Sequence, residues 1–127
     1  MTKKKILIVE DNEKNMKLVR DILVHQGHQV IEAVTGESGV QLALAERPDL
    51  VLMDIQLPDI SGVTALQRIR EDASLDAVPV LAVSASVMPD EQQRIVSSGF
   101  DAFIAKPLSL KPFLATVNEA LASGRKS

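Results

Sequence analysis

The sequence predicts an α/β domain with a doubly wound, five-stranded parallel sheet and helices on both of its faces. Short apolar runs of strand length alternate five times with longer stretches whose apolar residues recur at helical spacing. Three of the apolar runs are continuous rather than alternating, as expected of parallel strands that are covered on both faces. This alternation favours a parallel sheet whose strands are connected through helices.

The five apolar runs mark the expected strands. They cover residues 6–9, 30–34, 50–53, 80–83 and 102–105. The first, third and fourth runs are the continuous ones, so we expect these strands to be covered on both faces.

Helical spacing marks the five connecting segments. In the first, Met16, Val19 and Leu23 recur at positions i, i+3 and i+7, and Gly27 provides a stop at the C-terminal end. The apolar residues of the other four segments are, in chain order, Val40, Ala43 and Leu44; Val63, Leu66 and Ile69; Ile95 and Val96; and Phe113, Val117 and Leu121.

Prolines, a glycine and a threonine predict where several of these helices begin and end. Thr35 precedes the second helix, which must end before Pro48. The third helix closes before Pro79. Pro89 suits the first turn of the fourth helix, and Gly99 follows its end.

One domain accounts for the chain of 127 residues. We expect it to span residues 1–122, followed by a short tail, 123–127, with no output domain. The absence of Cys excludes disulfides, cysteine catalysis and cysteine-type zinc sites, and is compatible with a reducing cytoplasm. The apolar run at residues 6–9 is too short for a signal peptide or a membrane span, so we expect a soluble cytoplasmic protein without membrane association.

Composition argues against nucleic-acid binding. The net charge of −3 does not favour contacts with phosphates, and the chain holds three Phe but no Trp or Tyr on which bases could stack.

Chemically active residues follow four of the five strands. Ligands of a doubly wound sheet collect outside the carboxyl ends of its strands. The residues at these ends are Glu10, Asp11, Asp54, Ser84 and Lys106. Each has an ordinary alternative taken singly: Asp11 or Asn12 could cap the first helix, and Lys106 could be a surface charge. Together these five residues predict a functional site at the carboxyl edge of the sheet.

The chemistry of these groups points to phosphoryl transfer. Carboxylates held close together repel one another, and a hard cation such as Mg²⁺ relieves the repulsion. Asp54 could attack phosphorus as a nucleophile and form an acyl phosphate. The Lys106 ammonium and the Ser84 hydroxyl could stabilise phosphoryl oxygens.

These residues carry a resemblance to a known family. Over essentially its whole length the sequence resembles the CheY-like receiver domains of bacterial response regulators, and the matching segments are 8–12, 53–62, 83–85 and 106–107. Segments 10–18 and 52–58 are most similar to single-domain regulators of the DivK type. The resemblance implies a flavodoxin-like sheet with strand order 2-1-3-4-5.

The resemblance also implies a role for each site residue. Asp54 becomes the phosphoacceptor. Glu10, Asp11 and Asp54 become Mg²⁺ ligands, together with the backbone carbonyl of Gln56. Ser84 takes the place of the switch hydroxyl, and Lys106 that of the family's lysine.

Two further positions follow from the same resemblance. The bond between Lys106 and Pro107 is expected to be cis. Phe103 matches the switch aromatic, which is often Tyr in the family, so a hydroxyl is missing here; ordinary core packing is the alternative for this ring.

The expected function is that of a single-domain response regulator in a two-component phosphorelay. A sensor histidine kinase or a histidine phosphotransfer protein would supply the phosphoryl group from phosphohistidine. Phosphorylation would move the segment 86–98 and switch a surface that binds a downstream protein. The chain would catalyse its own phosphotransfer and autodephosphorylation and no other reaction, so we do not expect an enzyme in the usual sense.

Three other functions fit the sequence less well. A phosphatase of the haloacid dehalogenase type would carry Asp-x-Asp after its first strand, whereas Asp54 follows the third. A flavodoxin-like cofactor binder needs a phosphate loop where Glu10 and Asp11 would repel the phosphate. A pseudo-receiver would fold alike, act through binding alone, and remain unphosphorylated.

Overall fold

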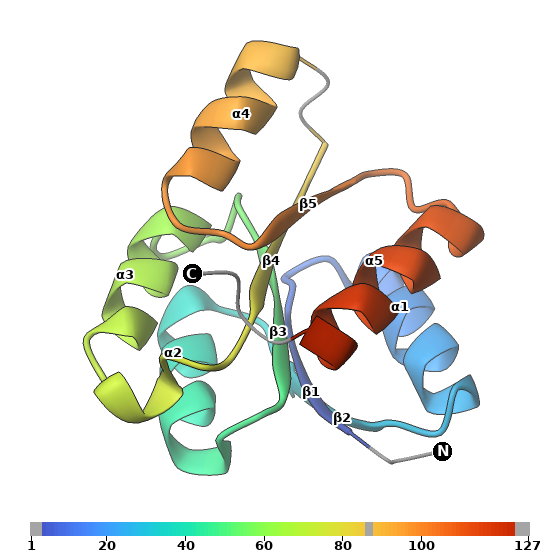
Figure 1. Ribbon diagram of the computed structural model, residues 1–127, viewed down its shortest axis with the longest axis horizontal. Coiled ribbons are helices and arrows are strands. Elements are labelled where there is room, and N and C mark those ends of the chain that lie inside the picture. The colour runs from blue at the N-terminus through green and yellow to red at the C-terminus, as the bar shows by residue number, and fades with distance from the viewer. Residues whose placement is uncertain (1–3, 86–87, 124–127) are drawn as a thin grey trace.

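The computed structural model describes residues 4–85 and 88–123, and Figure 1 shows their arrangement. Within these residues the chain forms five strands, five α-helices and one short 3₁₀ helix. Their bounds are β1 (Lys5–Val9), α1 (Glu13–His25), β2 (Gln29–Ala33), α2 (Gly36–Glu46), β3 (Leu50–Asp54), α3 (Gly62–Arg70), η1 (Ala73–Leu75), β4 (Val80–Ser84), α4 (Pro89–Ser97), β5 (Ala102–Ala105) and α5 (Leu110–Ser123).

The strands form one parallel sheet in the order β2-β1-β3-β4-β5, which confirms the predicted fold and strand order. From β1 the chain first adds β2 on one side and then β3 on the other. The connections therefore diverge between β1 and β3, and this divergence opens a crevice at the carboxyl ends of these two strands.

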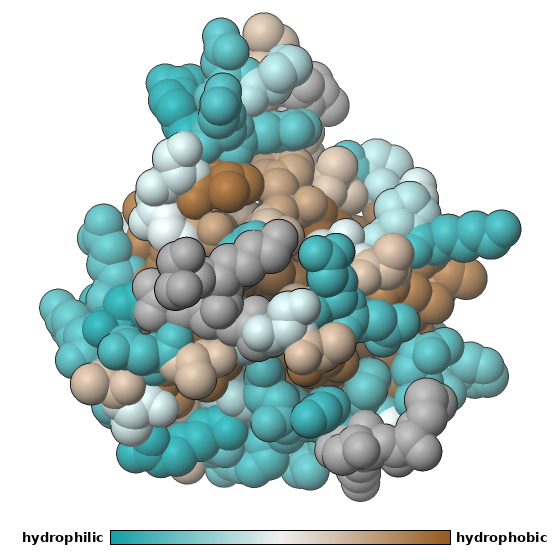
Figure 2. Space-filling view, in the orientation of Figure 1, coloured by the Kyte–Doolittle hydropathy of each residue, from teal (hydrophilic) through white to brown (hydrophobic). Residues whose placement is uncertain are grey.

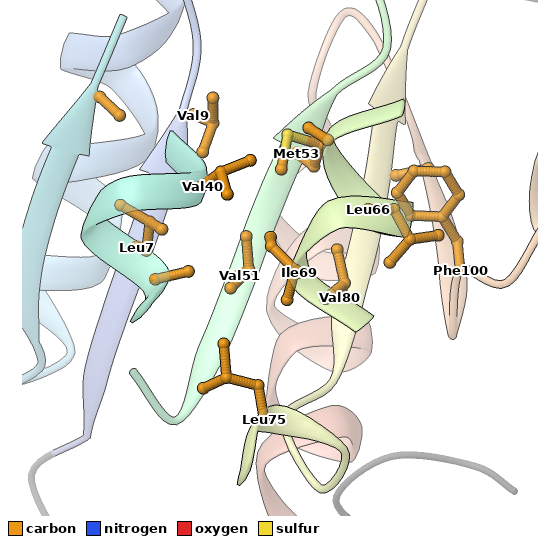
Figure 3. Close-up of a cluster of buried hydrophobic side chains, with 14 of the residues drawn as sticks. Leu7, Val9, Val40, Val51, Met53, Leu66, Ile69, Leu75, Val80 and Phe100 are labelled. Atoms are coloured by element: carbon orange, nitrogen blue, oxygen red, sulfur yellow. The ribbon is translucent and has the colours of Figure 1, made fainter. Parts of the chain in front are cut away.

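Two layers of apolar side chains cover the two faces of the sheet. Leu7 and Val9 point to the face packed by α2, α3 and α4, whereas Ile6 and Ile8 point to the face packed by α1 and α5. Figure 3 shows the first of these clusters, with Leu66 and Ile69 of α3 lying over the middle of the sheet. All residues of β3 and β4 are buried, as their continuous apolar runs predicted.

Strand boundaries differ from the expected ones by a residue or so, because backbone pairing extends past the apolar runs. β1 and β2 begin with the polar pair Lys5 and Gln29. β3 continues to Asp54, which pairs with Val83. At the end of β2, Val34 lies outside the strand and is exposed.

Helix ends agree with the predicted caps. The Asn12 side chain accepts a hydrogen bond from the Asn15 N–H at 3.0 Å, so Asn12 rather than Asp11 caps α1. Thr35 caps α2. Gly27 and Gly99 follow α1 and α4 with φ of 90° and 124°, a conformation that favours glycine.

The helix α4 is weakly attached, because it has fewer buried residues than any other described α-helix. All of its residues are described, and Ile95 alone among them is buried. Figure 1 shows α4 standing away from the other helices, and Figure 2 shows a mostly hydrophilic surface over it. Of the segment expected to move, 86–98, residues 86 and 87 lie outside the described part of the chain.

The predicted C-terminal tail covers residues 123–127. Ser123 is the last residue of α5, and residues 124–127 lie outside the described part of the chain. Among the described helices, none combines the length and apolar composition that crossing a bilayer requires.

Candidate functional site

Three charged side chains stand at the carboxyl edge of the sheet. Glu10 directly follows β1, Asp54 ends β3, and Lys106 directly follows β5. The sheet's hydrogen bonding continues into two of these positions, because the Glu10 N–H donates to the Ala33 carbonyl and the Lys106 N–H to the Ser84 carbonyl, each at 2.9 Å. Backbone pairing therefore fixes where these side chains emerge.

Glu10, Asp11 and Asp54 form a cluster of carboxylates. One oxygen of each lies within 4.8 Å of the others, an arrangement that could hold a metal ion. Glu10 and Asp54 are buried, with exposed fractions of 4% and 5%, whereas Asp11 is exposed. Oxygen ligands of this kind suit a hard divalent cation that keeps part of its water shell.

The Lys106 ammonium contacts both buried carboxylates. Its Nζ lies 2.7 Å from Glu10 Oε1 and 3.0 Å from Asp54 Oδ2. Backbone N–H groups hold the remaining oxygens: Asn12 donates to Glu10 Oε2 at 3.2 Å, and Gln56 donates to Asp54 Oδ1 at 2.9 Å. Both carboxylates are thus fixed in orientation from two sides.

Burial shifts the protonation of this cluster. It raises the pKa of Glu10 from 4.5 to about 7, and the hydrogen bond with Asp54 acts in the same direction against the contact with Lys106. Burial alone lowers the pKa of Lys106, but its hydrogen bonds to Glu10 and Asp54 outweigh that effect and leave the pKa raised. With one ammonium for two buried carboxylates, the site favours binding a further positive charge.

An open cleft of about 590 Å³ gives access to these groups. Its lining combines the acidic cluster with the loops after β1, β3, β4 and β5: Glu10, Asp11, Asn12, Asn15, Asp54, Gln56, Leu57, Pro58, Ala85 and Lys106. The structure thus brings together Glu10, Asp11, Asp54, Gln56 and Lys106 of the predicted site residues.

Ser84 and Phe103 do not line the cleft. Ser84 is buried at the end of β4, pairs with Ala105, and does not line the cleft, which its neighbour Ala85 does. Phe103 is half-buried and packs against the core while also lining a separate groove of about 310 Å³ between α4 and α5. The Lys106–Pro107 peptide bond is cis, as expected.

Sequence reasoning missed contacts that backbone groups make. Two backbone hydrogen bonds, from the Asn12 N–H to Glu10 and from the Gln56 N–H to Asp54, orient the buried carboxylates. Every residue type except Pro has this N–H, so the sequence does not indicate either bond. Sequence reasoning also missed Asp59, whose carboxylate accepts hydrogen bonds from the backbone of α2, 22 and 23 residues earlier in the chain.

The sequence of this chain is similar to those of known proteins. The family model of the response regulator receiver domain matches residues 6–118. The chain is 42% identical to the polar-differentiation response regulator DivK of Brucella anthropi over 118 residues, which cover 93% of this chain and 96% of that protein.

Solved structures agree with the fold. A response regulator structure from Chloroflexus aurantiacus superposes with a TM-score of 0.90 at 26% identity, covering 95% of this chain and 99% of that one. The receiver domain of a sensor histidine kinase from Pseudomonas aeruginosa PAO1 superposes with a TM-score of 0.88 at 27% identity, covering 96% of this chain and 100% of that one. That structure has a magnesium ion coordinated in its active site cleft.

Proposed function

This chain belongs to the family of response regulator receiver domains of two-component systems, and from that premise we propose that it takes a phosphoryl group on Asp54. The observation that carries the proposal is the placement of the Asp54 carboxylate. It lies in an open cleft beside the carboxylates of Glu10 and Asp11, and the Lys106 ammonium is 3.0 Å from its Oδ2. A cation held by these acids would, together with the ammonium, supply the positive charge that phosphoryl transfer to a carboxylate needs.

We propose Mg²⁺ as the cation of this site. The donor set fits, because it consists of carboxylate oxygens of Glu10, Asp11 and Asp54 with the Gln56 backbone beside them and room for water. The magnesium ion in the receiver domain of the Pseudomonas kinase supports the choice. When bound, Mg²⁺ would neutralise negative charge on the phosphoryl oxygens.

The proposed reaction makes one bond and breaks one. A carboxylate oxygen of Asp54 attacks the phosphorus of a phosphohistidine, the O–P bond forms, and the P–N bond breaks with its electron pair going to the imidazole nitrogen. The Lys106 ammonium, already in contact with Oδ2, stabilises charge on the phosphoryl oxygens. Attack of water on the phosphorus later releases phosphate and restores the carboxylate.

The proposed partners are a sensor histidine kinase or a histidine phosphotransfer protein upstream and a protein target downstream. In this proposal the chain catalyses only its own phosphotransfer and autodephosphorylation, and its output is a change of binding surface. Ser84, Phe103 and the weakly attached α4 are the elements we propose to move. We also propose a cytoplasmic location, with which the absence of Cys is compatible.

Intact-mass spectrometry after incubation with acetyl phosphate and Mg²⁺ tests the assignment. We expect the parent to gain the mass of one phosphoryl group and Asp54→Asn to gain none. Asp21→Asn is the matched control, because Asp21 is an exposed acid on α1 that pairs with Lys17 and lies outside the cleft; it should be labelled like the parent. Stoichiometric labelling of Asp54→Asn refutes the proposal, and an unlabelled parent identifies a pseudo-receiver.

A further inference from the structure

The loop that follows Asp54 is tied to the first turn of α2 by one side chain. Asp59 Oδ1 accepts a hydrogen bond from the Gly36 N–H at 2.8 Å, and Oδ2 accepts one from the Glu37 N–H at 2.9 Å. The first N–H groups of a helix have no partner within it. Thr35 satisfies that of Ser38, at 3.1 Å, so Asp59 completes the cap from a distant part of the chain.

The contact between this loop and α2 is close as well as charged. A Cβ on Gly36 would lie 2.4 Å from Cγ1 of Ile60, so the loop approaches the helix at a point where only a glycine leaves room. Hydrogen bonds, above all that from the Glu37 N–H, hold the pKa of Asp59 below its usual value, which indicates an ionised carboxylate. An ion pair between Glu37 and Arg68 links the same turn of α2 to α3.

The other end of this loop is held against the phosphoacceptor strand. The Gln56 N–H donates to Asp54 Oδ1 at 2.9 Å, and the Gly62 N–H donates to the Ile55 carbonyl at 2.9 Å. A Cβ on Gly62 would lie 2.4 Å from the Asp54 carbonyl oxygen. Between these fixed points, Gln56, Leu57 and Pro58 line the cleft.

We infer that Asp59 is a positioning residue for the cation site: its carboxylate anchors the loop 55–61 on α2 and thereby fixes where Gln56 and the Asp54 carboxylate lie. The inference rests on the proposed function, because it concerns the Mg²⁺ that the cleft is proposed to hold. Asp59 itself is exposed and does not line the cleft. It acts through the loop and touches no reacting group.

Loss of this carboxylate should loosen the loop. Asp59→Asn keeps the size of the side chain but has one carbonyl oxygen where two carboxylate oxygens each accept a bond, and it removes a negative charge from the start of a helix. In this variant, the loop would have to become ordered when the cation binds. Residues that orient metal ligands from outside typically change metal affinity by about 10–100-fold, and we expect a weakening near the lower end of that range.

The experiment compares Asp59→Asn with a chemically matched control. Asp49 is also an exposed aspartate whose Oδ2 accepts a backbone N–H from a distant residue, that of Lys5 at 2.8 Å, but it lies at the opposite edge of the sheet. Both variants remove a carboxylate charge, but only Asp59→Asn loses an acceptor, because Asp49 uses a single oxygen that the amide replaces. Mg²⁺ affinity is measured from the rise in thermal stability with MgCl₂, and amide hydrogen exchange of residues 55–62 is measured without metal.

The inference predicts that Asp59→Asn binds Mg²⁺ about tenfold more weakly than the parent and exchanges residues 55–62 faster, while Asp49→Asn matches the parent in both. Asp59→Glu, which retains the carboxylate, should recover part of the affinity. Equal Mg²⁺ affinity in Asp59→Asn and Asp49→Asn, with the parent binding normally, overturns the inference and leaves the proposed function intact. A parent that binds no Mg²⁺ overturns both.

Discussion

Glu10 and Asp54 share a single ammonium group, and this imbalance controls the chemistry of the metal-free site. Lys106 contacts one oxygen of each, while neighbouring N–H groups occupy the other oxygens. Two buried negative charges with one positive charge between them are costly. The site therefore gains when it takes up either a proton or a metal cation, and the two compete.

The first prediction concerns pH. Because the pKa of Glu10 rises from 4.5 to about 7, the folded protein between these values holds a proton that the unfolded chain has lost. The contribution of Glu10 to stability in EDTA should therefore fall as the pH rises from about 5 to 8. The lowered pKa values of Asp21, Asp59 and Asp72 act at more acidic pH. Burial lowers the pKa of His28 below 6.5, which makes stability rise with pH in the same range, so the comparison with Glu10→Gln is needed to isolate Glu10.

Urea denaturation at pH 5, 6, 7 and 8 measures this dependence, with Glu10→Gln as the test variant. The amide cannot titrate, so the decline between pH 5 and 8 should be clearly smaller in Glu10→Gln. In the parent, Mg²⁺ affinity should also fall as the pH drops below about 7, because protons then compete for Glu10. An identical pH profile in both proteins would remove Glu10 as the titrating group.

The second prediction concerns Asp54→Asn without metal. The amide keeps the shape of the side chain and relieves the repulsion with Glu10 and Asp11, and Lys106 retains its contact with Glu10. The free energy of unfolding in EDTA at pH 8 should be unchanged or higher than that of the parent. A loss of more than about 2 kcal/mol, a large effect for a single substitution, would contradict the view that repulsion dominates here.

Among the described α-helices, α4 has the fewest buried side chains. Ile95 is the one buried residue of this fully described helix, and the helix follows β4, whose last residue is Ser84. Few buried apolar contacts mean a low free energy for local opening. We therefore expect α4 to be the α-helix that the proposed phosphoryl group displaces most easily.

The third prediction separates this displacement from the chemistry. Ser84→Ala should still be phosphorylated on Asp54. On phosphorylation, hydrogen exchange of residues 88–98 should change in the parent and barely change in the variant. Lys106→Ala should instead slow phosphorylation on the order of a hundredfold, because it removes a fixed charge from the reacting centre. An exchange response of Ser84→Ala equal to that of the parent would show that the signal leaves the site by another route.

Prediction from sequence worked best where one side chain decides the local structure. Thr35, Gly27 and Gly99 marked helix ends that the structure confirms. It failed where the main chain decides. The 3₁₀ turn at Ala73–Leu75 and the left-handed Arg47 (φ 48°) depend on how the chain must travel between a helix and the next strand, and no residue type there requires either.

In the whole molecule, the parallel direction of all described strands made the position of the site predictable. Carboxyl ends of parallel strands meet at one edge, so residues 10, 54 and 106 could be assigned to one place before any distance was known. The contact between Asp59 and α2 could not be predicted, because it depends on how closely the loop 55–61 approaches the helix. Such contacts follow from packing of the complete fold and leave no periodic pattern in the sequence.

The fourth prediction concerns the stability of the entire domain. A cation that binds only the folded state stabilises it, by about 2.7 kcal/mol at a concentration a hundred times its dissociation constant. The melting temperature of the parent should rise with MgCl₂ and that of Asp11→Ala much less. Since Asp11 is exposed, the substitution alone should cost little. NaCl at matched ionic strength is the control, and equal shifts in both proteins would remove Asp11 from the site.

Lys106 directly follows the last strand of the sheet, and this has a consequence for biosynthesis. A chain that emerges from the ribosome presents Glu10 and Asp54 early, but the ammonium that contacts both arrives only after all five strands have been made. Until β5 docks, the nascent polypeptide holds its acids without their counter-charge. If Asp54 is phosphorylated as proposed, competence for phosphorylation begins only when translation has passed the final strand, and we expect an unfinished chain not to compete for the phosphodonor.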